Sequence, residues 1–121
     1  MAQMVINTIL FLLIAWFFAS RLLPARDVRT IDAADLKKEL GNKKVQYIDV
    51  RTPLEFHAHH IHGFKNIPLH ELKERAHELS KEQEVIVICQ SGMRSTKASK
   101  LLKKLGFQQV TNVTGGMNAW R

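Results

Sequence analysis

The stretch that decides the fold reads Val85-Ile86-Val87-Ile88-Cys89-Gln90-Ser91-Gly92-Met93-Arg94-Ser95. Its apolar start is typical of a buried strand, and the amphipathic segment from Ser95 to Leu105 is typical of a helix. The turn between them holds Cys89, the only cysteine of the chain. Backbone N–H groups in such a turn form a concave anion site, which favours the thiolate of a cysteine held there. We interpret Cys89 as a catalytic nucleophile and residues 90–95 as its substrate-binding loop.

Strands and helices are expected to alternate on both sides of this stretch. Strands are predicted over residues 28–31, 45–50, 85–88 and 110–113, and helices over 32–40, 52–56, 70–79 and 95–105. Asp32 and Thr52 are expected to cap the first two helices, and residues 57–68 to form a loop or short strand. This order predicts a small α/β domain with a mainly parallel sheet flanked by helices. Sites in such sheets lie beyond the carboxyl ends of the strands, where Cys89 and residues 49–51 fall.

The N-terminal segment differs from the rest in having no charge. Residues 1–20 contain no charged side chain, whereas all 18 Lys and Arg and all 11 Asp and Glu residues lie from Arg21 onward. Twenty helical residues at ~1.5 Å each span ~30 Å, the hydrocarbon thickness of a bilayer. We predict a transmembrane anchor over residues 1–23, a linker over 24–29 and a soluble domain over 30–121. A cleaved signal peptide is the rival interpretation, but it requires a basic start that this sequence lacks.

The distribution of charge predicts the orientation of this span. Arg21, Arg26 and Arg29 follow it and no basic side chain precedes it, so the positive-inside rule places the domain in the cytoplasm. A single cysteine agrees with a reducing compartment. The net charge of +7 suits an anionic leaflet of the cell membrane and a small anionic substrate. Nucleic acid is not an expected partner, because no nucleic-acid motif accompanies the charge.

The spacing of Cys89 and Arg94 limits the size of the ligand. Four residues separate them, one fewer than in loops of the tyrosine-phosphatase type, which surround a tetrahedral phosphoryl group. A shorter loop forms a tighter cup, which suits a single sulfur atom on the cysteine or the end of a small oxyanion. Sulfur transfer is therefore favoured, and a phosphatase or arsenate reductase is the less favoured alternative.

Several motifs resemble those of the rhodanese family of sulfurtransferases. Residues 89–95 resemble its Cys-x-x-Gly-x-Arg-Ser loop, and Tyr47-Ile48-Asp49-Val50-Arg51 resembles its Asp-Val-Arg segment. Glu55-Phe56 with His60-Ile61-His62-Gly63-Phe64-Lys65-Asn66-Ile67-Pro68 resembles its Glu-Phe and Gly-His-Ile-x-Gly-Ala-x-Asn-Ile-Pro segments. Gly115-Gly116-Met117-Asn118-Ala119-Trp120 resembles its closing Gly-Gly and Trp. The matches occur in the family's order over residues 30–120.

The resemblance implies a single rhodanese domain that works without a cofactor. Cys89 would accept sulfane sulfur from thiosulfate or a persulfide donor and carry it as a persulfide. Because the chain has no second cysteine, the sulfur must pass to an external thiol or another thiophilic acceptor. The main alternative is a non-catalytic rhodanese-like adaptor at the membrane, but a pure binding module has no need of a primed thiolate.

The other site residues have roles that their chemistry suggests. Gly92 permits a positive φ. Arg94 is expected to stabilise substrate oxygens or loop carbonyls, and Ser95 to cap the following helix with its hydroxyl toward the sulfur. Asp49 and Arg51 are expected to support the loop, either through a polar network or, as we favour, through a structural salt bridge.

Three further features are given plainer interpretations. His59 and Phe64 depart from the family pattern, where a glycine and a small residue are usual. Four histidines between residues 57 and 62 are interpreted as solvated loop residues and not as metal ligands, since no cysteine or distant ligand accompanies them. The lysines of the last predicted helix are interpreted as a solvated face, with proximity to lipid as an addition; these are Lys97, Lys100, Lys103 and Lys104.

Overall fold

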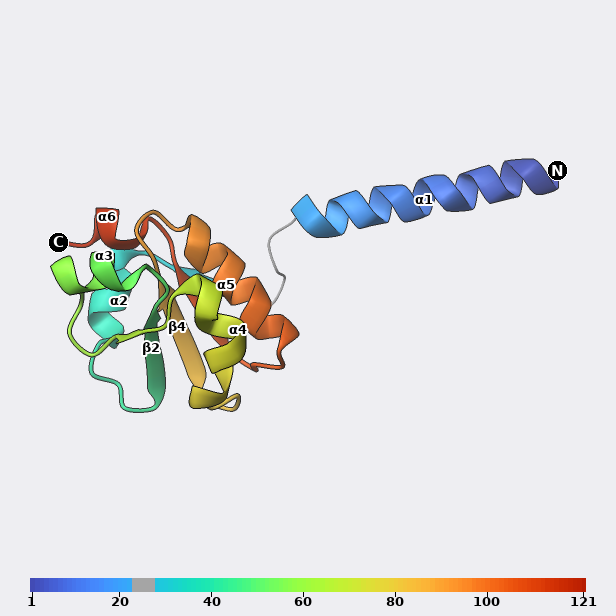
Figure 1. Cartoon of the computed structure of the whole chain (residues 1–121). Coiled ribbons are helices and arrows are strands. Elements are labelled where there is room, and N and C mark those ends of the chain that lie inside the picture. The colour runs from blue at the N-terminus through green and yellow to red at the C-terminus, as the bar shows by residue number, and fades with distance from the viewer. Residues whose placement is uncertain (23–27) are drawn as a thin grey trace.

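The computed structural model describes residues 1–22 and 28–121 of the chain. The helix α1 (Ala2–Leu22) precedes a domain in which helices cover both faces of one sheet (Figure 1). The predicted linker residues 24–27 lie outside the described residues. The strand β1 (Val28–Ile31) pairs with β5 (Val110–Val113) from Val28 onward. The sheet therefore begins at Val28, before residue 30, because backbone pairing takes in the last two residues that we assigned to the linker.

The side chains of α1 described here are exposed, and the window Ala2–Ala19 has a mean hydropathy of 2.0. Two of its polar side chains form hydrogen bonds within the helix: Gln3 donates to Asn7 at 3.1 Å, and the Thr8 hydroxyl donates to the Met4 carbonyl at 2.8 Å. Among the described residues this is the one helix long and apolar enough to cross a membrane, and a signal sequence would pass the same test.

The sheet has five strands in the order β1-β5-β4-β2-β3, and every pair is parallel. The central strand is β4 (Glu84–Ile88), the apolar run that leads into Cys89. β2 (Val45–Asp49) lies beside it, and β3 (Lys65–Asn66) forms the short edge strand. The four predicted strands and the parallel sheet are confirmed, and the short strand lies inside the segment expected to be loop or strand.

Alternation along β4 divides the core into two clusters. Val85 and Val87 face one side of the sheet with Leu102, whereas Ile86 and Ile88 face the other side with Leu36. Because successive side chains of a strand point to opposite faces, a continuous apolar run requires helices on both sides. The segment α4 (Leu72–Arg75) and the helix α5 (Met93–Lys104) cover the first face, and α2 (Ala33–Glu39) and α6 (Gly116–Ala119) cover the second (Figure 1).

The two predicted N-caps are both formed. Asp32 begins α2 with a reciprocal capping box to Asp35, and Thr52 begins α3 (Pro53–Ala58) with the same arrangement to Glu55. Each box satisfies two backbone N–H groups that the first turn of a helix leaves free. Local sequence therefore determines where these two helices start.

The predicted continuous helix over residues 70–79 is wrong. The segment is divided into η1 (Leu69–Glu71), α4 (Leu72–Arg75) and η2 (Ala76–Glu78). None of the three has a side-chain cap, and the Leu69 N–H is held by the Val50 carbonyl at 3.0 Å. A short uncapped helix is marginal by itself, so its ends tighten into 3₁₀ turns while packing keeps Leu72 buried.

Candidate active site

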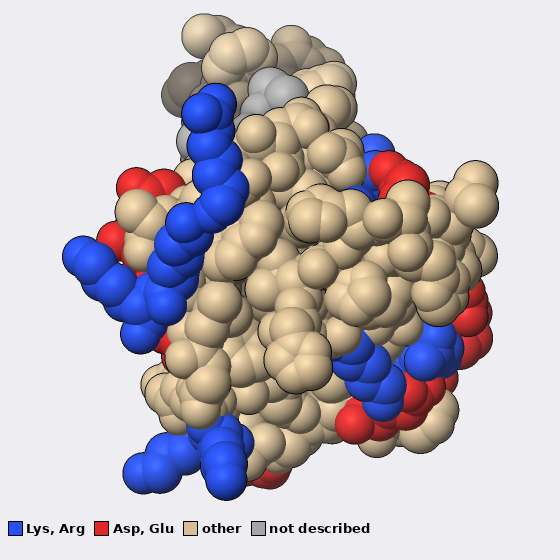
Figure 2. Space-filling model, turned by 90° about the vertical axis from the view of Figure 1, so that its left-hand side faces the viewer, with Lys and Arg blue, Asp and Glu red and all other residues tan. Residues whose placement is uncertain are grey.

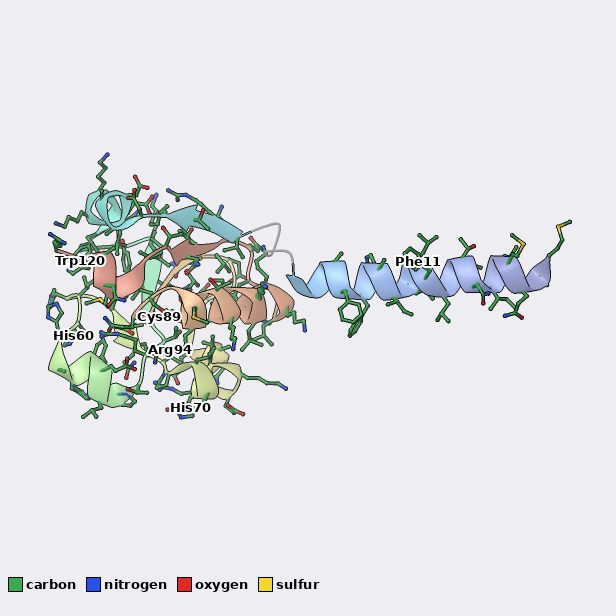
Figure 3. All side chains as sticks on the ribbon, turned by 90° about the horizontal axis from the view of Figure 1, so that it is seen from above. Phe11, His60, His70, Cys89, Arg94 and Trp120 are labelled. Atoms are coloured by element: carbon green, nitrogen blue, oxygen red, sulfur yellow. The ribbon has the colours of Figure 1, made fainter. Side chains whose placement is uncertain are left out.

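Cys89 lies immediately after the central strand β4, and its side chain is fully buried. The loop of residues 90–92 follows, and α5 begins at Met93, so the thiol sits between the end of a strand and the start of a helix (Figure 3). Gly92 is the N-cap of α5, with a φ of +108° that a residue with a side chain rarely adopts. The role expected for Gly92 is confirmed, whereas Ser95 lies inside the helix and is not its cap.

Three groups surround the sulfur atom. The N–H groups of Gly92 and Ser95 donate to Cys89 Sγ at 3.0 and 3.3 Å. The thiol in turn donates to Ser95 Oγ at 3.4 Å, and that hydroxyl donates to the Gly92 carbonyl at 3.1 Å. When the thiol loses its proton, the Ser95 hydroxyl can turn from the carbonyl to the sulfur. The loop thus offers two fixed donors and one adjustable donor to a negative sulfur atom.

The closing glycine pair lets α6 pack directly against this loop. The Met117 N–H donates to the Cys89 carbonyl at 2.8 Å, and the Asn118 N–H donates to the Gln90 carbonyl at 3.0 Å. A Cβ on Gly116 would lie 2.3 Å from the Cys89 carbonyl oxygen, so only glycine permits this approach. The sequence motif identified the pair without indicating this role, because the contact joins segments far apart in the chain.

Arg94 pairs with a carboxylate and not with the loop carbonyls, and the other expected role, stabilisation of substrate oxygens, stays a prediction. Its two Nη atoms donate to the two carboxylate oxygens of Glu55 in α3 at 2.7 and 2.9 Å, and each side chain is about one-third exposed. The pKa of Glu55 is lowered to about 2, mainly by the hydrogen bonds from Arg94, and Glu55 in turn raises the pKa of Arg94. The pair ties α3 to the start of α5. Sequence reasoning missed Glu55 as a site residue, although the motif contained it.

Asp49 and Arg51 form both of the arrangements that were considered. Arg51 is 3% exposed and donates through Nη2 to Asp49 at 2.8 Å, a buried salt bridge. It also donates through Nη1 to Gln90 Oε1 at 3.2 Å and through Nη2 to the His59 carbonyl at 2.7 Å. The salt bridge is therefore also the centre of a network that reaches the cysteine loop. The salt bridge and the polar network, which were expected as alternatives, occur together.

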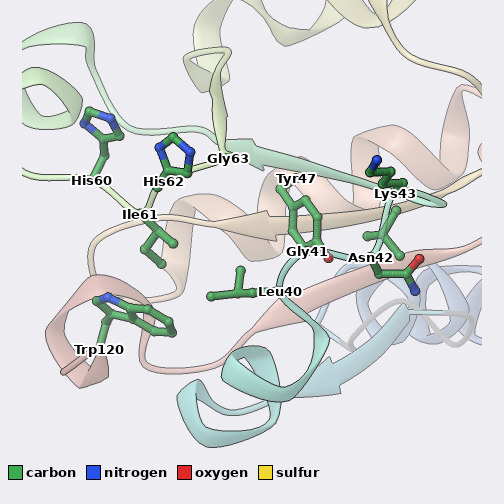
Figure 4. A pocket seen from close by; sticks show the side chains of 11 residues that line it. Leu40, Gly41, Asn42, Lys43, Tyr47, His60, Ile61, His62, Gly63 and Trp120 are labelled. Carbon is green, nitrogen blue, oxygen red and sulfur yellow. The ribbon is translucent and has the colours of Figure 1, made fainter.

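The histidine-rich segment lies at the end of the domain that carries α3 and α6. His60 stacks on Phe56 at 3.9 Å between ring centroids, and with His62 and Trp120 it lines a pocket of about 770 Å³ (Figure 4). Phe64 is buried against Tyr47, which accounts for a large residue at that position. Within residues 1–22 and 28–121, no three His, Cys, Asp or Glu side chains are grouped to hold a metal ion. The centre of this face carries little charge, and both basic and acidic side chains lie along its edges (Figure 2).

Comparison with known families agrees with this geometry. Residues 32–121 match the family model of the rhodanese-like domain. The chain belongs to the rhodanese-like family. Its parallel sheet flanked by helices is the fold of that family, and family membership supports a function as a sulfurtransferase or a sulfur carrier.

Individual relatives cover most of the chain. The uncharacterized protein YqhL of Bacillus subtilis is 35% identical over 120 residues, which cover 99% of this chain and 94% of that protein. A sulfurtransferase of Allochromatium vinosum is 34% identical over 94 residues, covering 77% of this chain and 88% of that protein.

Solved structures show the same domain. A rhodanese-related protein of Thermoplasma volcanium has a TM-score of 0.69 at 37% identity and covers 76% of this chain and 89% of its own. The human single-domain sulfurtransferase TSTD1 has a TM-score of 0.68 at 28% identity and covers 75% of this chain and 93% of its own.

Proposed function

We propose that this protein is a membrane-anchored sulfurtransferase that carries sulfane sulfur as a persulfide on Cys89. The observation that carries the proposal is the arrangement around Sγ, where two N–H groups lie at 3.0 and 3.3 Å and the Ser95 hydroxyl lies at 3.4 Å. Donors fixed before the reaction stabilise negative charge on sulfur without the cost of reorganising solvent. Residues 90–95 supply this environment, and the networks of Arg94 and Arg51 hold it in place.

The first half of the reaction loads the cysteine. The Cys89 thiolate attacks the outer sulfur of thiosulfate, a new S–S bond forms at Sγ, and sulfite leaves with the electron pair of the bond that breaks. The product is an enzyme persulfide whose terminal sulfur carries the negative charge. A persulfide donor reacts in the same way, with a thiolate as the leaving group.

The second half transfers the sulfur to an external acceptor. A thiolate or cyanide attacks the terminal sulfur of the persulfide, and Cys89 leaves as the thiolate that the loop stabilises. The chain contains no second cysteine to resolve the persulfide internally. Each cycle therefore depends on an acceptor that approaches the loop from outside.

The test uses the full chain purified in a neutral detergent. With thiosulfate and cyanide, we expect thiocyanate release over many turnovers, and mass spectrometry should show one added sulfur on Cys89 before cyanide is added. Cys89→Ser should lose both signals, because a hydroxyl cannot form a persulfide. A wild-type protein that never acquires sulfur would overturn the proposal, and sulfur uptake without turnover would indicate a carrier instead of an enzyme.

We include in the proposal that residues 1–23 anchor the protein in the cell membrane with the domain in the cytoplasm. The support is the exposed apolar surface of α1 and the arginines that follow it in the sequence. We expect the wild-type protein in the membrane fraction, with its domain cleaved by protease in inside-out vesicles and protected in intact cells. Leu12→Arg combined with Leu13→Arg should release it, since each charge at a span centre costs ~2.5–3.5 kcal/mol. Cleavage from outside intact cells would contradict this topology, and a domain that stays in the membrane fraction after removal of α1 would contradict the anchor.

A further inference from the structure

The edge of the sheet at which the chain enters the domain is basic. Val28, the first residue of β1, is aligned with Val110 of β5, which is aligned with Val85 of β4. Because the strands are parallel, the loops that lead into β2, β4 and β5 lie at this same edge. These loops are residues 40–44, 79–83 and 105–109. With the last turn of α5 they carry five lysines, which we call the basic edge: Lys43, Lys44, Lys81, Lys103 and Lys104.

The lysines of the basic edge are available to a partner. Four of them are exposed and Lys103 is half-buried. None forms an ion pair with a described residue. The neighbouring carboxylates of Glu39 and Glu84 are both paired with Arg29, which leaves Glu82 as the one carboxylate of the three loops. The edge therefore combines clustered positive charge with few carboxylates to neutralise it.

The opposite edge of the sheet, which carries the cysteine loop, has a different charge. The segments that follow β1, β2, β4 and β5 contain no lysine; they are Asp32 and residues 50–52, 89–92 and 114–115. Arg51 and Arg94 at this edge are both paired with carboxylates. Figure 1 shows α5 running from the cysteine loop toward the side at which α1 joins the domain. The 12 residues of this helix separate the two edges by ~18 Å.

The connection between α1 and the basic edge is short. Residues 23–27 join Leu22 to Val28. A chain extends by at most ~3.6 Å per residue, so Val28 stays within ~20 Å of the end of α1. With α1 across a bilayer, the basic edge is the part of the domain that the chain keeps nearest to the headgroups. An anionic leaflet attracts clusters of lysines placed beside a membrane span.

We propose that the basic edge docks on the anionic headgroups of the membrane that holds α1, and that this docking keeps the cysteine loop away from lipid. The inference rests on the membrane anchor included in the proposed function. The loop then lies ~18 Å from the headgroups, about two Debye lengths at physiological salt. An anionic sulfur donor therefore reaches Cys89 outside the negative potential of the leaflet, which depletes anions close to the surface. Docking thus determines which way the site faces.

The experiment places the full chain in lipid nanodiscs of phosphatidylcholine, either alone or mixed with phosphatidylglycerol. A neutral acetylating ester is applied briefly, and mass spectrometry gives the rate at which each lysine reacts. At ~0.1 M salt, Lys81 and Lys104 should react about fivefold more slowly in the anionic discs, the factor that one lysine near an anionic leaflet contributes. Lys97, on the same helix but nearer to Cys89, should react equally in both discs. Salt at ~1 M should abolish the protection.

A variant and a matched control separate docking from general attraction. Lys81→Gln/Lys104→Gln removes two charges from the basic edge, and Lys103 should then react at nearly the same rate in both kinds of disc. Lys97→Gln/Lys100→Gln removes the same charge from the other half of α5 and should leave the protection of Lys103 unchanged. None of the four substituted lysines is paired with a described carboxylate, so neither variant leaves a carboxylate without its partner.

Three results would overturn the inference. They are protection that is the same with and without phosphatidylglycerol, protection of Lys97 equal to that of Lys104, and an equal loss of protection in the variant and its control. A chain that copurifies with the discs but shows no protected lysine refutes the docking alone. A chain that does not copurify with the discs refutes the membrane anchor instead, and sulfur loading of Cys89 is measured separately from both.

Discussion

The two flanks of the cysteine loop differ in how their polar groups are paired. On the flank toward α3, Arg94 is paired with Glu55, and Arg51 is paired with Asp49 and Gln90. On the flank toward β5, Lys97 and Lys100 form no ion pair with a described residue. The first flank has the features of a support that fixes the loop, and the second has groups free to meet a ligand. The same loop is thus supported by paired side chains on one flank and bordered by unpaired lysines on the other.

This difference has a physical basis in burial. Arg51 and Asp49 are 3% and 0% exposed, so each would be a costly charge without the other. Lys97 is exposed and is solvated by water when no ligand is present. Stability should therefore depend strongly on the paired flank and weakly on the open flank, and substitution of each can test the contrast.

The largest effect is expected for Arg51→Ala. Removal of the guanidinium leaves the Asp49 carboxylate buried without its partner and frees Gln90 from its contact, which should destabilise the domain by ~3–5 kcal/mol. Lys97→Ala is the comparison from the open flank and should change stability by no more than ~0.5 kcal/mol. Urea unfolding of both variants, followed by circular dichroism, measures the two values. Equal destabilisation would show that the two flanks do not differ as described.

A smaller effect is expected for Gly116→Ala. Its Cβ would lie 2.3 Å from the Cys89 carbonyl oxygen, which forces α6 away from the loop and weakens the hydrogen bonds from Met117 and Asn118. Gly63→Ala is the matched control, because Gly63 has a φ of +95° and open space around the added Cβ. The control should lose ~1–2 kcal/mol from backbone strain alone, and Gly116→Ala should lose about 1–3 kcal/mol more from the clash.

Sulfur uptake by Cys89 gives a second measure of the difference between Gly116→Ala and Gly63→Ala. Gly116→Ala should also load less sulfur on Cys89 per folded molecule, since the carbonyl groups of the loop lose their support from α6. Gly63→Ala should load normally once folded. If both variants lose the same stability and load equally well, the close approach of α6 has no effect on the site.

Much of the fold was predictable because its determinants are local. The apolar run before Cys89 required a strand buried on both faces, and the capping boxes of Asp32 and Thr52 depend on residues three positions away. The predicted helix over residues 70–79 failed because its geometry depends on contacts with other segments, such as the hydrogen bond from Leu69 to Val50. The sequence pattern within one segment does not predict such contacts with distant segments.

The candidate site shows the same limit. The position of the cysteine loop between a strand and a helix followed from one contiguous stretch, and that of Asp49 and Arg51 from their place at the end of the neighbouring strand. The pairing of Arg94 with Glu55 joins residues 39 positions apart, so spacing within the loop gave no indication of it.

The smallest effect on stability is expected for the partly exposed ion pair between Glu55 and Arg94. The pKa of Glu55 is lowered from 4.5 to about 2, first by its hydrogen bonds with Arg94. A carboxylate with a lowered pKa in the folded state adds stability that is complete above pH 4.5 and is lost as the pH falls toward 2. Glu55→Gln keeps the capping contact to Thr52 but removes the charge. Wild type should exceed this variant by about 1 kcal/mol at neutral pH, since solvent screens a pair this exposed.

Urea midpoints of wild type and Glu55→Gln, measured from neutral pH down toward pH 2, test this dependence. The difference between them should be constant from neutral pH to about pH 4.5 and should disappear as Glu55 becomes protonated below it. If the difference between the two proteins were unchanged near pH 2, the charge of the Glu55 carboxylate would not be the source of the stabilising contact between α3 and α5. Because Arg94 stays charged throughout, the decrease of this stability difference on acidification reports the protonation of Glu55 alone. The contribution of the Glu55–Arg94 pair is thereby measured separately from that of the buried Asp49–Arg51 pair on the same flank.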